Sequence, residues 1–288
     1  MIVKIVTAQD TSPGRWLTAV RLSILAFLLT LFCLELIVVS GRISPLWYST
    51  ALMTGVIFRA PLKHIPLLLA GCVAGTTLAN LLIIGPALSN VKFAILNLIQ
   101  ALLAGGMLRL LLNRRAPLNA LPDWIRFALC AGVLAPLLGG LIALWLLQVD
   151  KQALLPFLTT WVISEVIGVL AFGPVVLLWP DKPLRELIAP GRQLETLLTL
   201  LVTLLASYLS LRFLPWPFTF IVVILFWCAV RLPKFEAFLL CFINASFISL
   251  LLALDWVNPV QSGASPGLVS AWLPFLLVLL PSHIMALI

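Results

Sequence analysis

The chain has 288 residues and a formal net charge of +8, with 62% hydrophobic and 10% charged residues. Soluble domains are about 45–50% apolar and about 25% charged, so this composition excludes a water-soluble globule and predicts a protein embedded in a bilayer. The 5 cysteines all lie in apolar stretches and none forms a Cys-x-x-Cys pair, which argues against a disulfide framework or a zinc site.

Apolar runs bounded by charged residues, prolines or glycines divide the chain into about ten segments. They lie near residues 16–39, 45–60, 65–84, 91–113, 122–147, 154–179, 194–213, 216–230, 234–254 and 268–288. The segments at 45–60 and 216–230 are short, so each is either a tilted span protected by its neighbours or a re-entrant segment, and the second case leaves eight spans. We predict an all-α polytopic transmembrane bundle at residues 16–288, preceded by a cytoplasmic tail at residues 1–15.

Basic residues alternate in number along the predicted connections. If the N terminus is cytoplasmic, each outside connection carries at most one basic residue and each inside loop carries at least two. The outside residues are Arg42, Lys92, Lys151 and Arg212, and the other 14 of the 18 basic residues are inside. This bias follows the positive-inside rule, so we predict that both termini are cytoplasmic, and the net charge requires no nucleic-acid partner. An apolar end at Ile288 without a basic stop is what we expect of an input module within a longer protein.

The two short segments carry a matching pattern of proline and arginine. It consists of Pro45, Arg59 and Pro61 in the first and of Pro217, Arg231 and Pro233 in the second, all offset by 172 residues. Because an even number of spans separates them, we predict a parallel internal repeat. Interrupted segments in matching places tend to hold the sites of membrane proteins, which makes Arg59 and Arg231 candidate site residues. The alternative is that both arginines only anchor span ends at the cytoplasmic surface.

Glu35 and Glu165 are the acidic residues that fall well inside predicted spans. A charge at a helix centre costs about 2.5–3.5 kcal/mol on insertion scales, so such residues usually face the bundle interior. Helical spacing places Trp161, Glu165 and Gly168 on one face of the sixth span, with Ser164 beside them. This face could form an aromatic-walled sensing pocket with a carboxylate, or Glu165 could be a buried carboxyl that only fixes helix packing.

We expect Glu165 to line an interior cavity and not to face lipid, with Trp47 and Trp227 of the two short segments as the opposing wall. Other intramembrane polar residues, Gln100 among them, are expected to make interhelical hydrogen bonds. The sequence shows no nucleophile–base pair, phosphate-binding loop or acidic metal cluster, so we expect no catalytic residue, metal or cofactor in this chain.

Several motifs match a known family. They are Pro45-Leu46-Trp47, Asn97-x-x-Gln100-Ala101, Asp123-Trp124-x-Arg126, Trp161-x-x-Ser164-Glu165-x-x-Gly168, Leu214-Pro215-Trp216-Pro217 and Trp227-x-Ala229-x-Arg231-Leu232-Pro233. From about Leu28 to Ile288 the chain resembles the MASE1 integral membrane sensory domain, and is most like the N-terminal region of enterobacterial diguanylate cyclases that carry PAS and GGDEF domains. The family often has Glu where this chain has Gln100, so a second carboxylate role does not carry over to that position.

The resemblance implies a sensory input domain in the bacterial inner membrane that controls cyclic-di-GMP synthesis, or a histidine kinase in other family members. Besides membrane lipids, it implies a C-terminal cytoplasmic signalling domain, a small-molecule or protein stimulus, and a second copy in a homodimer as partners. The alternative is a small permease that uses Glu35 and Glu165 as proton-relay groups. A permease should function as this chain alone, whereas a sensor needs its output domain.

Overall fold

The computed structural model describes residues 12–40, 46–180, 190–254, 256–257 and 273–288. Pro45, most of the predicted N-terminal tail and much of the loops after Pro180 and Leu254 lie outside the described residues. The separation into a tail and a membrane domain therefore stays a prediction.

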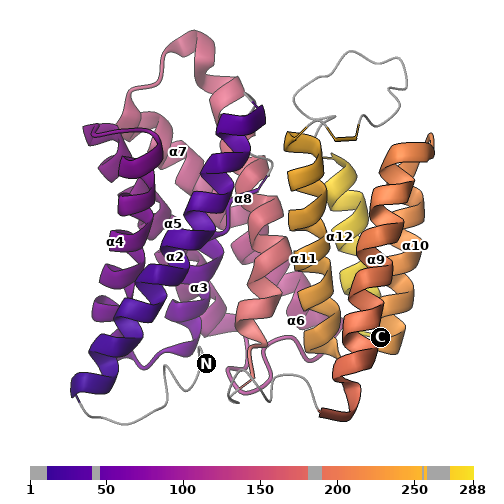
Figure 1. The fold of residues 1–288 in the computed structure, drawn as a ribbon. Helices are drawn as coiled ribbons and strands as arrows, with labels where there is room; N and C mark the ends of the chain where they lie inside the picture. The colour runs from indigo at the N-terminus through magenta and orange to yellow at the C-terminus, as the bar shows by residue number, and fades with distance from the viewer. Residues whose placement is uncertain (1–11, 41–45, 181–189, 255, 258–272) are drawn as a thin grey trace.

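All regular structure in the described residues is helical (Figure 1). The helices are α2 (Ser12–Ser40), α3 (Ser49–Arg59), α4 (Ile65–Ile83), α5 (Leu88–Leu111), α6 (Leu121–Phe127), α7 (Ala135–Leu147), α8 (Leu154–Leu177), α9 (Gln193–Phe213), α10 (Pro217–Arg231), α11 (Lys234–Ala253) and α12 (Leu273–Met285). Short turns, η1 (Leu62–His64), η3 (Lys151–Ala153) and η5 (Pro190–Arg192), precede α4, α8 and α9. Each of the ten predicted segments coincides with a helix or a continuous helical stack, which confirms the all-α bundle.

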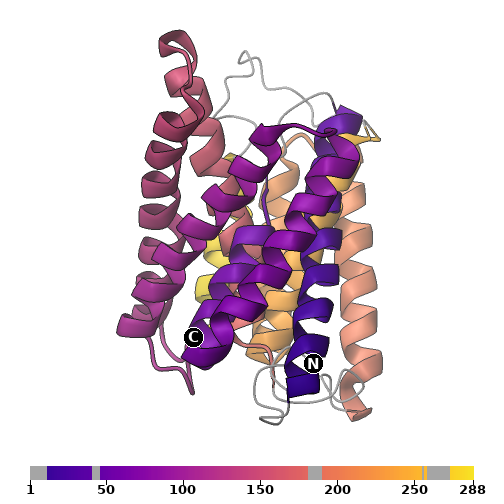
Figure 2. The ribbon, with the colours of Figure 1, turned by 90° about the vertical axis from the view of Figure 1, so that its left-hand side faces the viewer.

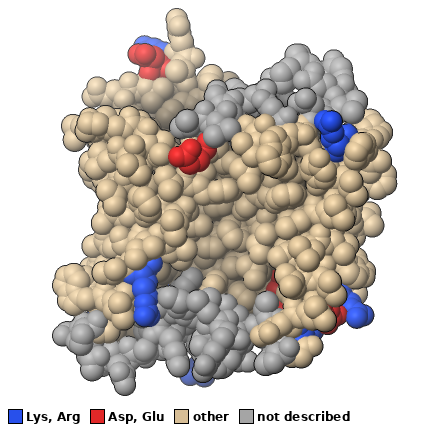
Figure 3. Space-filling model, viewed as in Figure 1, with Lys and Arg blue, Asp and Glu red and all other residues tan. Residues whose placement is uncertain are grey.

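The described part of the chain has 7 helical stretches that are long and apolar enough to cross a membrane. The short segments correspond to α3 and α10, and α12 is also short. Leucine, valine and tryptophan side chains lie exposed on the outer faces of many helices, among them Trp145 at 79% and Leu110 at 87% exposure. Figure 3 shows the consequence: charged side chains gather toward the two ends of the molecule, and a broad uncharged band separates them. This surface is that of a multi-pass membrane protein.

The fifth predicted span is a stack of α6, a π-helical segment η2 (Ala128–Leu134) and α7. The N–H of Ala135 bonds to the carbonyl of Cys130, five residues earlier. The next residue, Pro136, has no N–H and therefore cannot donate a hydrogen bond to a carbonyl of the preceding turn. The π-helical turn thus lies at a position where the regular α-helical hydrogen bonds are already interrupted. The stack still runs the full height of the bundle along one edge (Figure 2).

Glycines bring α2 and α4 into direct backbone contact. A Cβ atom on Gly71 would lie 2.5 Å from the carbonyl oxygen of Ala19, and one on Gly75 would lie 2.1 Å from that of Ser23. Real side chains do not tolerate such distances, so both positions require glycine. This is the small-residue packing by which membrane helices approach closely without a hydrophobic driving force.

The helices form two groups that meet at α8 and α11 (Figure 1). Aromatic rings fill this junction: Tyr48 lies 5.0 Å from Phe242 of α11, and Phe242 lies 4.7 Å from Phe172 of α8, between ring centroids. In one group α2 packs on α4 and α3 on α5, and in the other α9 packs on α11 and α10 on α12. These are the neighbours that a parallel repeat requires, and the repeat itself stays a prediction.

Candidate functional site

Helix α3 begins inside the bundle. It has 11 residues and rises roughly 16 Å, about half of the ~30 Å hydrocarbon thickness. Residues 46–48, which lead into it, have no regular secondary structure, and the N–H of Trp47 donates to the carbonyl oxygen of Ser164, 3.1 Å away, near the middle of α8. Residues 49–58 are all buried. The start of α3 is therefore a polar backbone feature in the apolar interior.

The residue before α3 and the first two residues of α3 connect this segment to three other helices through side-chain hydrogen bonds. They are Tyr48 Oη with Ser246 Oγ of α11 at 2.7 Å, Ser49 Oγ with Thr76 Oγ1 of α4 at 2.7 Å, and Thr50 Oγ1 with Glu165 Oε1 of α8 at 2.9 Å. Because three consecutive residues are hydrogen-bonded to three different helices, a displacement of this short segment would change its contacts with all three.

Glu165 is 3% exposed and is the centre of a hydrogen-bonded chain. Its Oε1 accepts from the hydroxyl of Thr50, and its Oε2 accepts from Gln100 Nε2 of α5 at 2.8 Å. Gln100 Oε1 in turn accepts from Trp161 Nε1 at 2.9 Å. We call Thr50, Gln100, Trp161 and Glu165 the Glu165 cluster. It joins α3, α5 and α8.

Within the described ranges, only uncharged donors contact the Glu165 carboxyl. An unpaired charge in the interior of a membrane protein is costly, and hydrogen bonds from neutral groups offset only part of that cost. The cluster is thus sensitive to any change in its hydrogen bonds.

Glycines of α7 and α8 make room for the cluster. A Cβ on Gly168 would lie 2.0 Å from the carbonyl oxygen of Trp47, so α3 can begin against α8 only because this residue is glycine. A Cβ on Gly139 would lie 2.4 Å from Gln100 Oε1, and one on Gly140 would lie 3.2 Å from Trp161 Cδ1. The glycine pair of α7 therefore lets both side chains reach their positions.

The family model named MASE1 matches residues 17–288. The chain belongs to the MASE1 family. The probable diguanylate cyclase DgcE of Escherichia coli (strain K12) is 38% identical over 278 residues, which cover 96% of this chain and 25% of DgcE. The chain thus spans about a quarter of the length of this relative. No solved structure matches it significantly. Membership confirms the resemblance stated above and identifies the chain as a membrane sensory input domain.

In this MASE1 domain, five of the predicted site residues come together: Trp47, Trp161, Ser164, Glu165 and Gly168. Glu165 lies inside the bundle and not on its outer surface, and its carboxyl is in contact with donor side chains. That it lines a cavity stays a prediction. The hydroxyl of Ser164 donates to the carbonyl oxygen of Thr160 in the same helix, at 2.7 Å. The carbonyl oxygen of Ser164 accepts from the N–H of Trp47. The indole Nε1 of Trp47 is buried and has no hydrogen-bond partner among the described residues.

Four predicted site residues lie elsewhere. Glu35 is exposed on α2, and Trp227 is 49% exposed on α10. The expectation that Trp227 forms the wall opposite Glu165 is wrong, because α10 packs against α9, α11 and α12 and turns this indole outward. Arg59 ends α3 and donates to the carbonyl of Leu177 at the end of α8, and Arg231 donates to Glu195 at 2.6 Å. Both arginines occupy the helix ends that the anchoring alternative assigns to them.

Two members of the cluster were not among the predicted site residues. The sequence predicts only an interhelical hydrogen bond for Gln100, and it predicts no role for Thr50. A signal for Thr50 does exist, because Tyr48-Ser49-Thr50 places three hydroxyl groups in a row at the start of a short apolar segment. Such a row is unusual where the chain has to cross hydrocarbon.

Proposed function

We propose that this MASE1 domain is the membrane input that regulates a cytoplasmic diguanylate cyclase. The observation that carries the proposal is the 38% identity to DgcE, which is named a probable diguanylate cyclase. The match takes up 25% of that protein, so most of its length remains for an output. In this view the chain receives a stimulus and its C-terminal helix α12 leads to the cyclase.

The Glu165 cluster is the element we propose for signal reception. It supports this role because a stimulus that alters one of its hydrogen bonds changes how the start of α3 sits against α8. Tyr48 precedes the cluster directly and bonds to Ser246 of α11, which packs against α12. A two-state displacement of the start of α3 would therefore reach the last helices of the chain.

The test is a chimera in which this chain replaces the matching region of E. coli DgcE, with cellular cyclic-di-GMP as the readout. Glu165→Gln keeps the shape of the side chain and removes its ionisable carboxyl, so we expect normal membrane levels and a changed basal output. Glu236→Gln is the matched control, because Glu236 is 4% exposed and bonded to Thr196, but sits in the first turn of α11 away from the cluster. If output is unaltered in both variants, Glu165 is a packing residue.

One observation favours the permease alternative. Transporters place the N-termini of half-length helices at their substrate sites near mid-membrane, and α3 begins beside Glu165 without a side-chain cap. Proteoliposomes that hold the chain alone and a trapped pH-sensitive dye separate the two functions. Proton flux that disappears in Glu165→Gln would support a permease, whereas an input domain should leave the vesicles impermeable to protons.

A further inference from the structure

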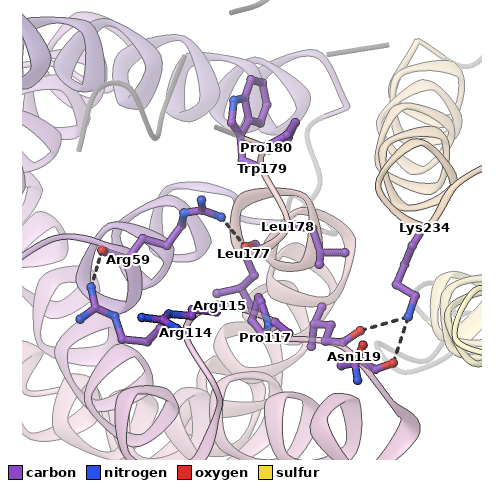
Figure 4. A pocket seen from close by; sticks show the side chains of 12 residues that line it. Arg59, Arg114, Arg115, Pro117, Asn119, Leu177, Leu178, Trp179, Pro180 and Lys234 are labelled. Carbon is purple, nitrogen blue, oxygen red and sulfur yellow. Dashed lines mark hydrogen bonds between the residues drawn. The ribbon is translucent and has the colours of Figure 1, made fainter. Parts of the chain in front are cut away.

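A cavity of about 500 Å3 opens at the end of the bundle where α3 and α8 finish and α11 begins. Its lining comes from the end of α3, the loop between α5 and α6, residues 177–180 at the end of α8 and just beyond it, and the start of α11. Figure 4 shows Arg59, Arg114 and Arg115 on one side of it and Lys234 on the other. It is separate from the Glu165 cluster, which lies midway along α8.

The lining is strongly basic. It includes Arg59, Arg114, Arg115 and Lys234, and among the residues that the structure describes it contains no aspartate or glutamate. Arg114 donates to the carbonyl oxygen of Arg59 at 2.6 Å, and Lys234 donates to that of Asn119 at 3.0 Å. These bonds orient the side chains of Arg114 and Lys234, but no carboxylate of the described ranges pairs with their charges, because a carbonyl group carries no net charge.

Arg115 differs from its neighbours. Within the part of the chain that the structure describes, its guanidinium makes no hydrogen bond and no ion pair. In Figure 4 its side chain lies between Arg114 and Pro117. Arg115 is exposed, so the five N–H donors of its guanidinium face solvent and can be taken up by an anion. Arg115 is thus the residue most available to a ligand.

We infer that this cavity binds a phosphate-bearing anion. Arginine presents paired donors whose geometry fits phosphate oxygens, and it is preferred where phosphate is recognised. The volume falls within the range of about 300–1,000 Å3 that is usual for ligand pockets. The site lies where several helices end, which is the depth of lipid headgroups, so the phosphate can belong to an anionic phospholipid or to a soluble compound.

An occupant would link parts of the chain that are far apart in sequence. Arg114 and Arg115 stand in the α5–α6 loop, Arg59 ends α3, and Lys234 begins α11. The inference does not depend on cyclic-di-GMP output, because it concerns binding to the chain itself.

The experiment measures binding to the purified full chain in uncharged detergent. The probes are short-chain phosphatidylglycerol, short-chain phosphatidylcholine as the zwitterionic comparison, and inorganic pyrophosphate as the soluble anion. We expect phosphatidylglycerol or pyrophosphate to bind, and Arg115→Gln to weaken that binding about tenfold through the loss of a charged hydrogen bond. Arg115→Lys keeps the charge and should retain part of the affinity.

Arg126→Gln is the matched control. Arg126 lies on α6 just beyond the same loop, is paired with Asp123 at 3.2 Å and does not line the cavity. This variant should stay within about twofold of the unsubstituted chain, as expected for an exposed charge. Binding of phosphatidylglycerol alone identifies a lipid site, and binding of pyrophosphate identifies a site for soluble phosphate. The inference is overturned if neither anion binds better than phosphatidylcholine, or if both Gln variants lose affinity equally.

Discussion

At the scale of single residues, the Glu165 carboxyl depends on two donors that come from other helices. Thr50 is 115 residues away in sequence and Gln100 is 65 residues away. In an interior of low dielectric constant such bonds are stronger than in water, and a missing partner is correspondingly costly. The pair Thr50 and Thr54 allows this to be measured, because both are buried threonines one turn apart on α3.

We predict that Thr50→Val destabilises the protein by about 1–3 kcal/mol, because Glu165 Oε1 loses its donor while remaining buried. Thr54→Val is the control. The Thr54 hydroxyl is buried and has no hydrogen-bond partner among the residues that the structure describes, so its replacement by a methyl group should be neutral or stabilising. Thermal unfolding of the two variants in detergent gives the comparison. Equal losses would mean that the Thr50–Glu165 bond contributes nothing specific.

The sequence predicts Glu165 but not its partners, for a physical reason. A carboxyl within an apolar run is conspicuous, since hydrocarbon penalises it more than any neutral side chain. Threonine and glutamine are common in membrane helices and mostly bond within or between helices for packing. Only the tertiary arrangement shows that these two converge on the carboxyl, and only it shows that Trp227 turns away.

At the scale of elements, hydropathy located the helices that the structure describes. It did not predict that the two short helices, α3 and α10, differ in burial. The matched prolines and arginines predict similar segments, yet all residues from 49 to 58 of α3 are buried, whereas α10 presents Phe220, Val223 and Trp227 to the outside. Burial depends on the neighbours: α3 is enclosed by α2, α4, α5 and α8, while α10 packs at the side of its group. The π-helical turn of the fifth span also has no hydropathy signal.

The contact between α3 and α8 rests on Gly168, and we predict that Gly168→Ala disrupts it. The added methyl group would lie 2.0 Å from a main-chain oxygen of Trp47, which cannot rotate out of the way. Overpacking of this kind costs about 1–3 kcal/mol or more, and it should also shift the Thr50 hydroxyl from Glu165.

Gly106→Ala is the control for that substitution, because nothing lies within 4 Å of the position of its Cβ. In the interior of α5 the change should be neutral or slightly stabilising, by up to about 1 kcal/mol. Unfolding temperature in detergent and yield in the membrane fraction report on both variants. If Gly168→Ala behaves like Gly106→Ala, the start of α3 is more adaptable than its packing indicates.

At the scale of the whole molecule, the two helix groups meet where Tyr48, two residues before Thr50 of the Glu165 cluster, contacts Ser246 and Phe242 of α11. The site that we propose for signal reception is therefore next to the boundary between the groups, and the basic cavity lies at one end of the same boundary. The all-helical class and the membrane character could be derived from composition and hydropathy. The placement of a polar cluster beside this boundary could not, because it follows from contacts between residues more than 60 positions apart.

The distribution of charge predicts which end of the bundle faces the cytoplasm, and single cysteines can test it. The 5 native cysteines are all buried, so background labelling by a maleimide that cannot cross the inner membrane should be low. Gln152 lies exposed in the turn before α8, and Asn119 lies exposed in the loop before α6, at the opposite end of the fifth span. We expect Gln152→Cys to be labelled in cells whose inner membrane is intact, and Asn119→Cys only after that membrane is permeabilised.

Because the inside loops carry most of the lysine and arginine residues, the reverse result would invert the topology. It would also place the basic cavity on the periplasmic face, where a cytoplasmic phosphate compound cannot reach it.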